Sequence, residues 1–130
     1  MTTLLLDSHV VHWWSAEPDR LSAAASAALS QADELAVAGV TWFELAWMAA
    51  RERIIVSFPV RSWLEELGAE VLTIAITPAI ASTAVSLPST FPGDPADRLI
   101  YATAVERGWR LVTKDRRLRR HRHPSPVTIW

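Results

Sequence analysis

Short apolar runs alternate along the chain with longer segments in which apolar residues recur at helical spacing. The apolar runs are too short for core helices, so we predict that they are buried strands. Only in the run at 70–76 does the spacing of apolar residues fail to distinguish strand from helix, and there the β-branched residues favour a strand. The predicted strands are residues 2–7, 35–40, 70–76, 109–113 and 127–130.

The intervening segments predict helices. In the first of them, Leu21, Ala25 and Leu29 recur at helical spacing within an alanine-rich stretch. Three prolines and a glycine mark residues 88–95 as a loop. The predicted helices are residues 20–32, 41–53, 60–69, 77–87 and 96–108, with a short helix or turn at 115–121.

Helix-end signals support several of these boundaries. Thr41 and Thr77 are suitable N-caps, and Pro78 suits a first helical position. Gly68 and Gly108 are suitable residues for ending a helix. The regular alternation of strand and helix indicates parallel pairing through right-handed crossovers, and therefore an α/β sandwich. No internal linker is apparent, so we predict a single domain over residues 1–130.

Composition narrows the protein class. The chain has 130 residues, half of them apolar, which suits one hydrophobic core. It has no cysteine, which excludes disulfides and thiolate metal sites. The N-terminus lacks a basic segment followed by a long apolar run, and no stretch of about 18 apolar residues occurs. We therefore expect a soluble cytoplasmic protein with no signal peptide and no membrane span.

Charge is unevenly distributed despite a formal net charge of −1. Residues 107–123 hold eight of the thirteen Lys and Arg and a single acid, so this segment carries +7 and the remainder −8. Such a segment suits a polyanion such as nucleic acid. A solvated helix end or a surface for an acidic protein partner explains it equally well.

Five acids occupy comparable places in the predicted fold. Asp7 and Asp115 follow predicted strands, Glu44 lies in the first turn of a helix after a strand, and Asp94 and Asp97 open the helix at 96–108. Strand carboxyl ends and the following helix starts share one edge of a parallel sheet, where open α/β folds place their ligands. We therefore expect the five carboxylates to converge on one rim.

Each acid also has a local explanation. Thr41 and Glu44 have the spacing of a capping box, and Asp94 suits an N-cap with Asp97 three residues later. Asp7 and Asp115 can cap whatever follows their strands. Capping explains the acids less well as a group than singly. If they cluster, two carboxylates about 4 Å apart repel by roughly 4 kcal/mol at an effective dielectric near 20. A cluster would require a cation, and oxygen ligands without thiolates favour Mg²⁺ or Mn²⁺ over Zn²⁺.

Other catalytic patterns are missing from the sequence. Ser8 and His9 are adjacent, which rarely makes a working pair, and neither a nucleophile elbow, a His-Glu-x-x-His motif nor a glycine-rich phosphate loop occurs. We interpret His12 as a packing residue, and His121 and His123 as solvated side chains.

Several motifs resemble those of PIN-domain proteins, and more narrowly of VapC-like ribonuclease toxins from bacterial toxin–antitoxin pairs. They are LLLDSHVVHWW, VTWFELAWM, GDPADRLIYATA, LVTKD and the closing VTIW, and the similarity runs from residue 3 to 130. The resemblance implies a three-layer α/β/α fold with a central parallel sheet. It also implies a Mg²⁺- or Mn²⁺-dependent endoribonuclease.

The resemblance assigns roles to individual positions. The family's catalytic and metal-binding acids fall on Asp7, Glu44, Asp97 and Asp115, with Asp94 as an additional carboxylate at or near the metal. Thr113 matches a hydroxyl residue that often precedes the last acid, and Arg98 matches an arginine expected to pair with an acid. Two positions depart from the pattern: Pro92 stands where His is common, and Met48 where Lys is common. These departures bear on substrate choice.

The same resemblance implies partners. A small cognate antitoxin usually wraps such a toxin and presents a basic side chain to the acids, and homodimers are common. The chain has seven tryptophans. Trp14, Trp47 and Trp63 can cover a dimer or antitoxin surface, although ordinary core packing explains each of them as well.

The leading hypothesis is hydrolysis of RNA by a Mg²⁺-activated water held by the acids, with Arg116, Arg117, Arg119 and Arg120 gripping the RNA backbone. A phosphoryl-transfer or phospho-acceptor domain built on Asp7 is a second reading, supported by Lys114 near the last predicted strands. A non-catalytic interaction domain of the same fold is a third. The sequence does not identify the RNA, the antitoxin or the number of metal ions.

Overall fold

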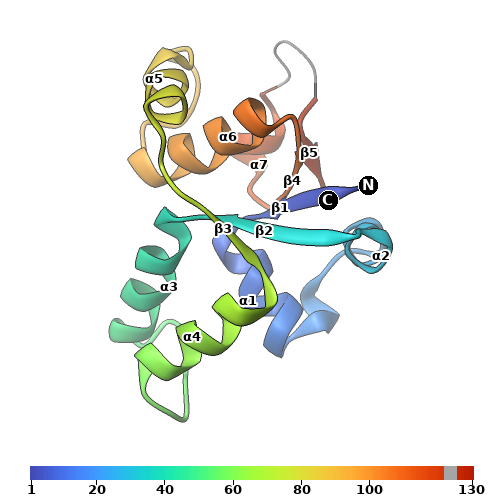
Figure 1. Cartoon of the computed structure of the whole chain (residues 1–130), viewed down its shortest axis with the longest axis vertical. Coiled ribbons are helices and arrows are strands. Elements are labelled where there is room, and N and C mark those ends of the chain that lie inside the picture. Colours follow the sequence, from blue (N-terminus) through green and yellow to red (C-terminus); the bar gives the residue numbers. More distant parts are fainter. Residues whose placement is uncertain (122–125) are drawn as a thin grey trace.

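Five parallel strands form one sheet in a computed structural model, which describes residues 1–121 and 126–130 of the chain (Figure 1). The strand order is β3-β2-β1-β4-β5, with β1 at the centre. The strands are β1 (Thr3–Leu6), β2 (Glu34–Ala38), β3 (Leu72–Ile74), β4 (Arg110–Val112) and β5 (Thr128–Ile129). All five predicted strands are confirmed. The prediction for His123 lies outside the described residues.

Helices connect each strand to the next. Between β1 and β2 lie α1 (Ser8–Ala16), the 3₁₀ turn η1 (Pro18–Arg20) and α2 (Ala23–Gln31), and between β2 and β3 lie α3 (Val40–Ala50) and α4 (Val60–Glu70). Between β3 and β4 lie α5 (Pro78–Ser86) and α6 (Pro95–Arg107), and α7 (Arg116–Arg119) precedes β5.

The sheet lies between two helical layers (Figure 1). Helices α1 to α4 pack on one face and α5 to α7 on the other, and each face has its own buried apolar cluster. The predicted three-layer α/β/α sandwich is confirmed. Because β1 lies at the centre of the sheet, the loop that follows it is surrounded by the starts of helices from both layers.

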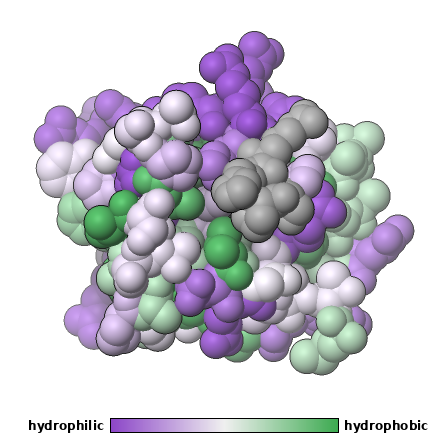
Figure 2. All heavy atoms as spheres, turned by 90° about the horizontal axis from the view of Figure 1, so that it is seen from above, coloured by the Kyte–Doolittle hydropathy of each residue, from purple (hydrophilic) through white to green (hydrophobic). Residues whose placement is uncertain are grey.

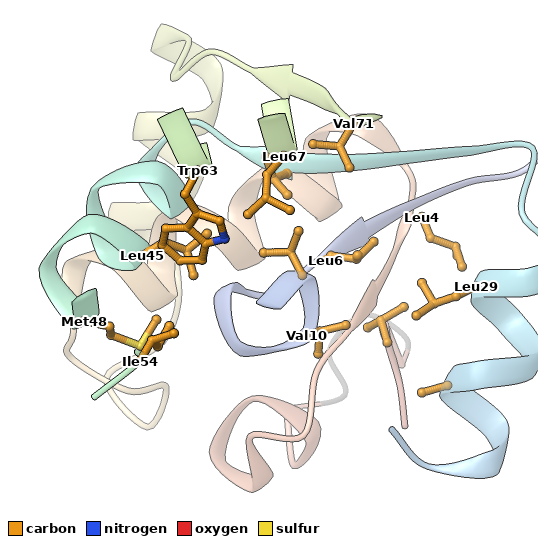
Figure 3. Close-up of a cluster of buried hydrophobic side chains, with 14 residues drawn as sticks. Leu4, Leu6, Val10, Leu29, Leu45, Met48, Ile54, Trp63, Leu67 and Val71 are labelled. Carbon is orange, nitrogen blue, oxygen red and sulfur yellow. The ribbon is translucent and has the colours of Figure 1, made fainter. Parts of the chain in front are cut away.

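The first apolar cluster joins α1, α3 and α4 to the sheet. Leu6, Val10 and Leu45 are fully buried in it, and the Trp63 ring points inward among them (Figure 3). Burying each side chain of this size contributes about 1.5–3 kcal/mol. Of the two interpretations open for Trp63, the structure therefore supports core packing, in which this α4 residue contacts the core shared with α1 and α3.

The second cluster fixes α6 against the other face of the sheet. Ile100 and Tyr101 from α6 are fully buried with Leu5 of β1 and Leu111 of β4. Gly108 ends α6 in the left-handed conformation, at a φ of 68°, which confirms the predicted helix end and explains the glycine. The start of α6 is thereby held at a fixed place beside the end of β1.

Helix α1 is absent from the prediction. Its nine residues include valines, histidines and tryptophans, which are mediocre helix formers. Tertiary packing stabilises this helix despite its low helix propensity, because Val10, Val11 and Trp13 are buried. Asp7 is its N-cap, and its side chain accepts a hydrogen bond from the Ser8 amide. The expectation that Asp7 caps the segment after the first strand is confirmed.

Two predicted helix ends are wrong. Helix α3 begins at Val40 with Gly39 as its N-cap, and Thr41 is completely buried within its first turn. Thr41 and Glu44 therefore do not form a capping box. Gly68 lies inside α4 and does not end it, because the helix continues to Glu70. The caps predicted at Thr77 and Asp94 are confirmed.

The outer surface is mainly polar on the side of α5 (Figure 2). That view shows hydrophilic residues along the top and much of the left edge, weakly hydrophobic residues at the right edge, and only small, separate patches of strongly hydrophobic residues. Within the described part of the chain, no helix has the length and apolar character needed to span a membrane.

Candidate active site

Asp7 lies at the carboxyl end of the central strand and is only 9% exposed. Its Oδ1 accepts a hydrogen bond from the Ser8 amide at 2.8 Å, and its Oδ2 accepts one from the Thr113 hydroxyl at 2.6 Å. Burial raises the pKa of Asp7, whereas these two hydrogen bonds act in the opposite direction. Thr113, at the end of the neighbouring strand β4, thus fixes the carboxylate in one orientation.

Glu44 reaches the same rim from α3. Its Oε1 accepts a hydrogen bond from the Ser8 hydroxyl at 2.5 Å, so Ser8 contacts Asp7 through its backbone and Glu44 through its side chain. Burial raises the pKa of Glu44, and the charges of Asp7 and Asp94 raise it further. An electrostatic effect of both aspartates on Glu44 indicates that the three groups are close together.

Asp94 and Asp97 come from the start of α6. Asp94 is the N-cap, and its Oδ1 accepts a hydrogen bond from the Asp97 amide at 3.1 Å. The Asp97 side chain is 13% exposed. Burial and the negative charges of Asp94, Asp7 and Asp115 together raise the pKa of Asp97 to about 7, although Arg117 acts in the opposite direction. Repulsion from the three other aspartates therefore favours the protonated form of Asp97.

Asp115 has the opposite electrostatic setting. It caps α7, and its carboxylate accepts hydrogen bonds from the Arg117 side chain at 3.1 and 2.7 Å and from the Arg117 amide at 2.8 Å. These bonds lower the pKa of Asp115. The same Arg117 Nη2 also donates to Asp97 Oδ2 at 3.1 Å. Arg117 therefore bridges two of the predicted site acids.

The acids meet at one edge of the sheet, but they are not arranged as a ligand cage. Residues from β1, α3, α6 and the end of β4 influence one another electrostatically. Within residues 1–121 and 126–130, no three His, Asp or Glu side chains are placed so that they could jointly hold a metal ion. Arg117 lies between two of the carboxylates and partly neutralises them.

Arg98 does not pair with an acid, contrary to expectation. Its guanidinium donates to backbone carbonyls of the segment that precedes α6, at 2.9–3.3 Å; the acceptors are Ala84, Leu87, Pro88, Phe91 and Pro92. Arg98 thereby holds the loop in front of the acids. Met48, at the position where the family commonly has Lys, is buried in the core and does not reach the rim.

The predicted RNA-binding arginines divide into two groups. Arg117 is engaged with the acids, as described above. Arg116, Arg119 and Arg120 have no ion pair among the described residues and line a hollow of about 510 Å³ on the side of β5. His121 is not simply solvated as expected, because its ring packs edge-on against Phe91 at 5.2 Å between centroids.

Two participants were missed at the level of sequence. The sequence suggests Ser8 only as a nucleophile, whereas in the structure it connects Asp7 with Glu44. Its position directly after the strand-end acid is the only signal in the sequence. The run of arginines predicts RNA binding for Arg117 and its neighbours alike, and nothing in it distinguishes the one that pairs with Asp97.

Comparison of the sequence with family models is consistent with this fold, a three-layer sandwich with acids at the carboxyl edge of its parallel sheet. The model described as the PIN domain matches residues 4–124. The chain belongs to the PIN-domain family.

Within this family, the chain is 71% identical over 130 residues to the protein named Ribonuclease VapC22 of Mycobacterium tuberculosis (strain ATCC 25618 / H37Rv), and the match covers all of both chains. Solved structures also resemble it. One is the crystal structure of VapBC2 from Rickettsia felis bound to a DNA fragment from the VapBC2 promoter. It matches with a TM-score of 0.68 and 14% identity, covering 98% of this chain and 97% of that one. A toxin–antitoxin complex from Klebsiella pneumoniae matches with a TM-score of 0.64 and 19% identity, covering 86% of both chains. At these identities the two structures support the fold alone.

Proposed function

We propose that this protein is a metal-dependent endoribonuclease, the toxin of a toxin–antitoxin pair, that acts on RNA in the cytoplasm. The observation that carries the proposal is the convergence of carboxylates from four segments on one rim, where repulsion and burial raise the pKa of Asp97 to about 7. The full-length 71% identity to a protein named a ribonuclease supports the same reaction class.

The donor chemistry of the rim fits Mg²⁺ or Mn²⁺. Asp7, Asp97 and Asp115 would hold the cation, with Glu44 and Asp94 contributing directly or through water, because hard cations prefer carboxylate oxygens. When bound, such a cation polarises the phosphate and supplies a nucleophilic water. Arg117 must leave its position between Asp97 and Asp115 for these oxygens to face a cation.

The residues of the chain prepare the rim for this chemistry. Thr113 and the Ser8 amide hold both oxygens of Asp7, and the Ser8 hydroxyl holds Glu44. These donors keep both acids in fixed orientations before any ligand arrives. The raised pKa lets Asp97 carry a proton near neutral pH in the metal-free protein, and a bound cation would displace that proton.

Cleavage of RNA in the presence of Mg²⁺ tests this proposal. We expect Asp7→Asn and Asp97→Asn to lower the rate at least about 100-fold, because loss of a metal site removes several kcal/mol of transition-state stabilisation. Asp19→Asn, which removes one acid from the turn η1, is the matched control and should cut normally. Equal rates for the parent and both site variants would refute the assignment.

The phospho-acceptor alternative is less compatible with the geometry. Lys114 would have to assist a phosphate on Asp7, but among the described residues it forms no ion pair with an acid. Lys114 Nζ lies over the Trp13 ring, 5.6 Å from its centroid. A labile phosphate adduct on Asp7, detected by mass after mixing with acetyl phosphate, would nevertheless favour this alternative.

A cognate antitoxin is the expected protein partner, and homodimers are part of the same proposal. Helix α3, which carries Glu44, also exposes Phe43 and Trp47, which are 65% and 49% exposed, with ring centroids 5.8 Å apart. Exposed neighbouring aromatic rings are typical of the core of a protein interface. We propose that the antitoxin covers this pair and thereby blocks access to the acids.

A further inference from the structure

A second feature lies beside the acid rim. A hollow of about 350 Å³ opens between the loop in front of α6 and the end of α7. The volume falls within the range of small-molecule sites in proteins. Its lining residues are Thr90, Phe91, Pro92, Arg117, Arg120 and His121.

Arg117 places this hollow next to the acids. Its guanidinium lines the hollow and also donates to Asp97 and Asp115, at 3.1 and 2.7 Å. A ligand in the hollow therefore lies one side chain away from the carboxylates. With Arg120, the hollow presents two guanidinium groups, which are well suited to bind a phosphate.

Aromatic rings form another part of the wall. The His121 ring packs edge-on against Phe91 and Tyr101, with centroids 5.2 and 5.3 Å away. Phe91 is 3% exposed and Tyr101 is completely buried, so both are fixed, and they fix the position of the imidazole. A planar imidazole next to arginines offers a surface on which a nucleobase can stack.

The opposite wall is held in place by Arg98. This guanidinium donates to carbonyls on both sides of Thr90, including Pro88 and Phe91, and it also lies over the Phe91 ring at 5.7 Å. Because the loop is already tied down by these contacts, a ligand would pay little entropy to order it. The hollow is preorganised, unlike a gap between loose side chains.

We propose that this hollow binds one nucleotide of the substrate RNA, adjacent to the scissile phosphate. The phosphate of that nucleotide contacts Arg117 and Arg120, and its base lies against His121. This subsite rests on the proposed ribonuclease function. The larger hollow, lined by Arg116, Arg119 and Arg120, lies on the β5 side of α7.

A nuclear magnetic resonance titration with nucleoside 5′-monophosphates in EDTA tests the subsite without metal or cleavage. We expect saturable shifts of Thr90, Phe91 and His121 signals and at least threefold weaker binding by Arg120→Gln. The matched control is Arg119→Gln, which removes the same charge from the adjacent residue; Arg119 lines only the larger hollow, whereas Arg120 lines both. Equal weakening by both variants, or equally tight binding of inorganic phosphate with the same shifts, would overturn the inference.

Cleavage assays separate this inference from the nuclease assignment. If the parent cuts RNA, Arg120→Gln should raise KM at least threefold with a smaller change in kcat, and His121→Ala should alter which bonds are cut. Unchanged KM and unchanged cut sites in both variants would overturn the subsite while the nuclease assignment stands. If the parent cuts no RNA, the nuclease assignment fails, and the nucleotide titration alone decides whether the hollow binds nucleotides.

Discussion

Replacing Asp97 by Asn should stabilise the metal-free protein at pH 8, although it removes a residue of the site. In the parent, burial and the charges of Asp94, Asp7 and Asp115 oppose ionisation of Asp97. Asn has nearly the same shape, and its amide oxygen can still accept the hydrogen bond from Arg117. The substitution therefore removes a repulsive charge and retains most of the packing.

The magnitude follows from the pKa. A rise of the Asp97 pKa from 3.8 to about 7 corresponds to about 4 kcal/mol if the folded state carries all of it. Solvent screens part of this repulsion, so we expect about 2 kcal/mol. For a domain of this size, that gain raises Tm by roughly 5–10 °C.

The direction of the pH dependence is fixed. Because the pKa of Asp97 is higher in the folded state, its contribution to stability is fully present below pH 3.8 and is lost as the pH rises through about 7. The Tm difference between Asp97→Asn and the parent should therefore be near zero at pH 4, grow between pH 4 and 7, and stay constant above that.

Thermal unfolding in EDTA across this pH range is the assay, and Asp19→Asn controls for the loss of one negative charge at a turn. That control should follow the parent at every pH. An Asp97→Asn protein no more stable than the parent at pH 8, or more stable by the same amount at pH 4, would show that the acids do not repel one another as described.

Three further outcomes are expected. Thr113→Val should lower stability by about 1–3 kcal/mol, measured by urea unfolding, because buried Asp7 loses its hydroxyl donor; Thr113→Ser keeps the hydroxyl and should lose only about 1 kcal/mol, from its missing buried methyl group. Arg98→Lys should cost roughly 2–3 kcal/mol and speed proteolysis of residues 87–93, because an ammonium cannot reach the same carbonyls; equal proteolysis would contradict this. Arg117→Gln should tighten Mn²⁺ binding about two- to fivefold by calorimetry, because an exposed ion pair worth up to about 1 kcal/mol no longer competes; weaker binding would mean that Arg117 does not compete with the cation.

Much of the fold was predictable because its strands are short, mostly apolar runs, and β1 and β2 are buried on both faces of the sheet. The helix at α1 was not, because Val10, Val11 and Trp13 favour helix only when the sheet and α3 are present to bury them. Thr41 illustrates the same limit: its sequence context suits a cap, yet the helix begins one residue earlier and buries it.

The site was predictable only in part. Strand ends and helix starts alone place Asp7, Glu44 and Asp97 at one edge, because parallel topology dictates that placement. The side-chain partners were not predictable in this way. Whether an arginine pairs with a carboxylate or with carbonyls depends on distances of about an ångström, and Arg98 and Arg117 reversed the roles expected of them.

Calorimetric titration with Mn²⁺ tests most directly whether the converging carboxylates form a metal site. We predict saturable binding by the parent that Asp7→Asn and Asp97→Asn each abolish and that Asp19→Asn retains. Binding that survives both site substitutions, or no saturable binding by the parent at millimolar Mn²⁺, would contradict the account.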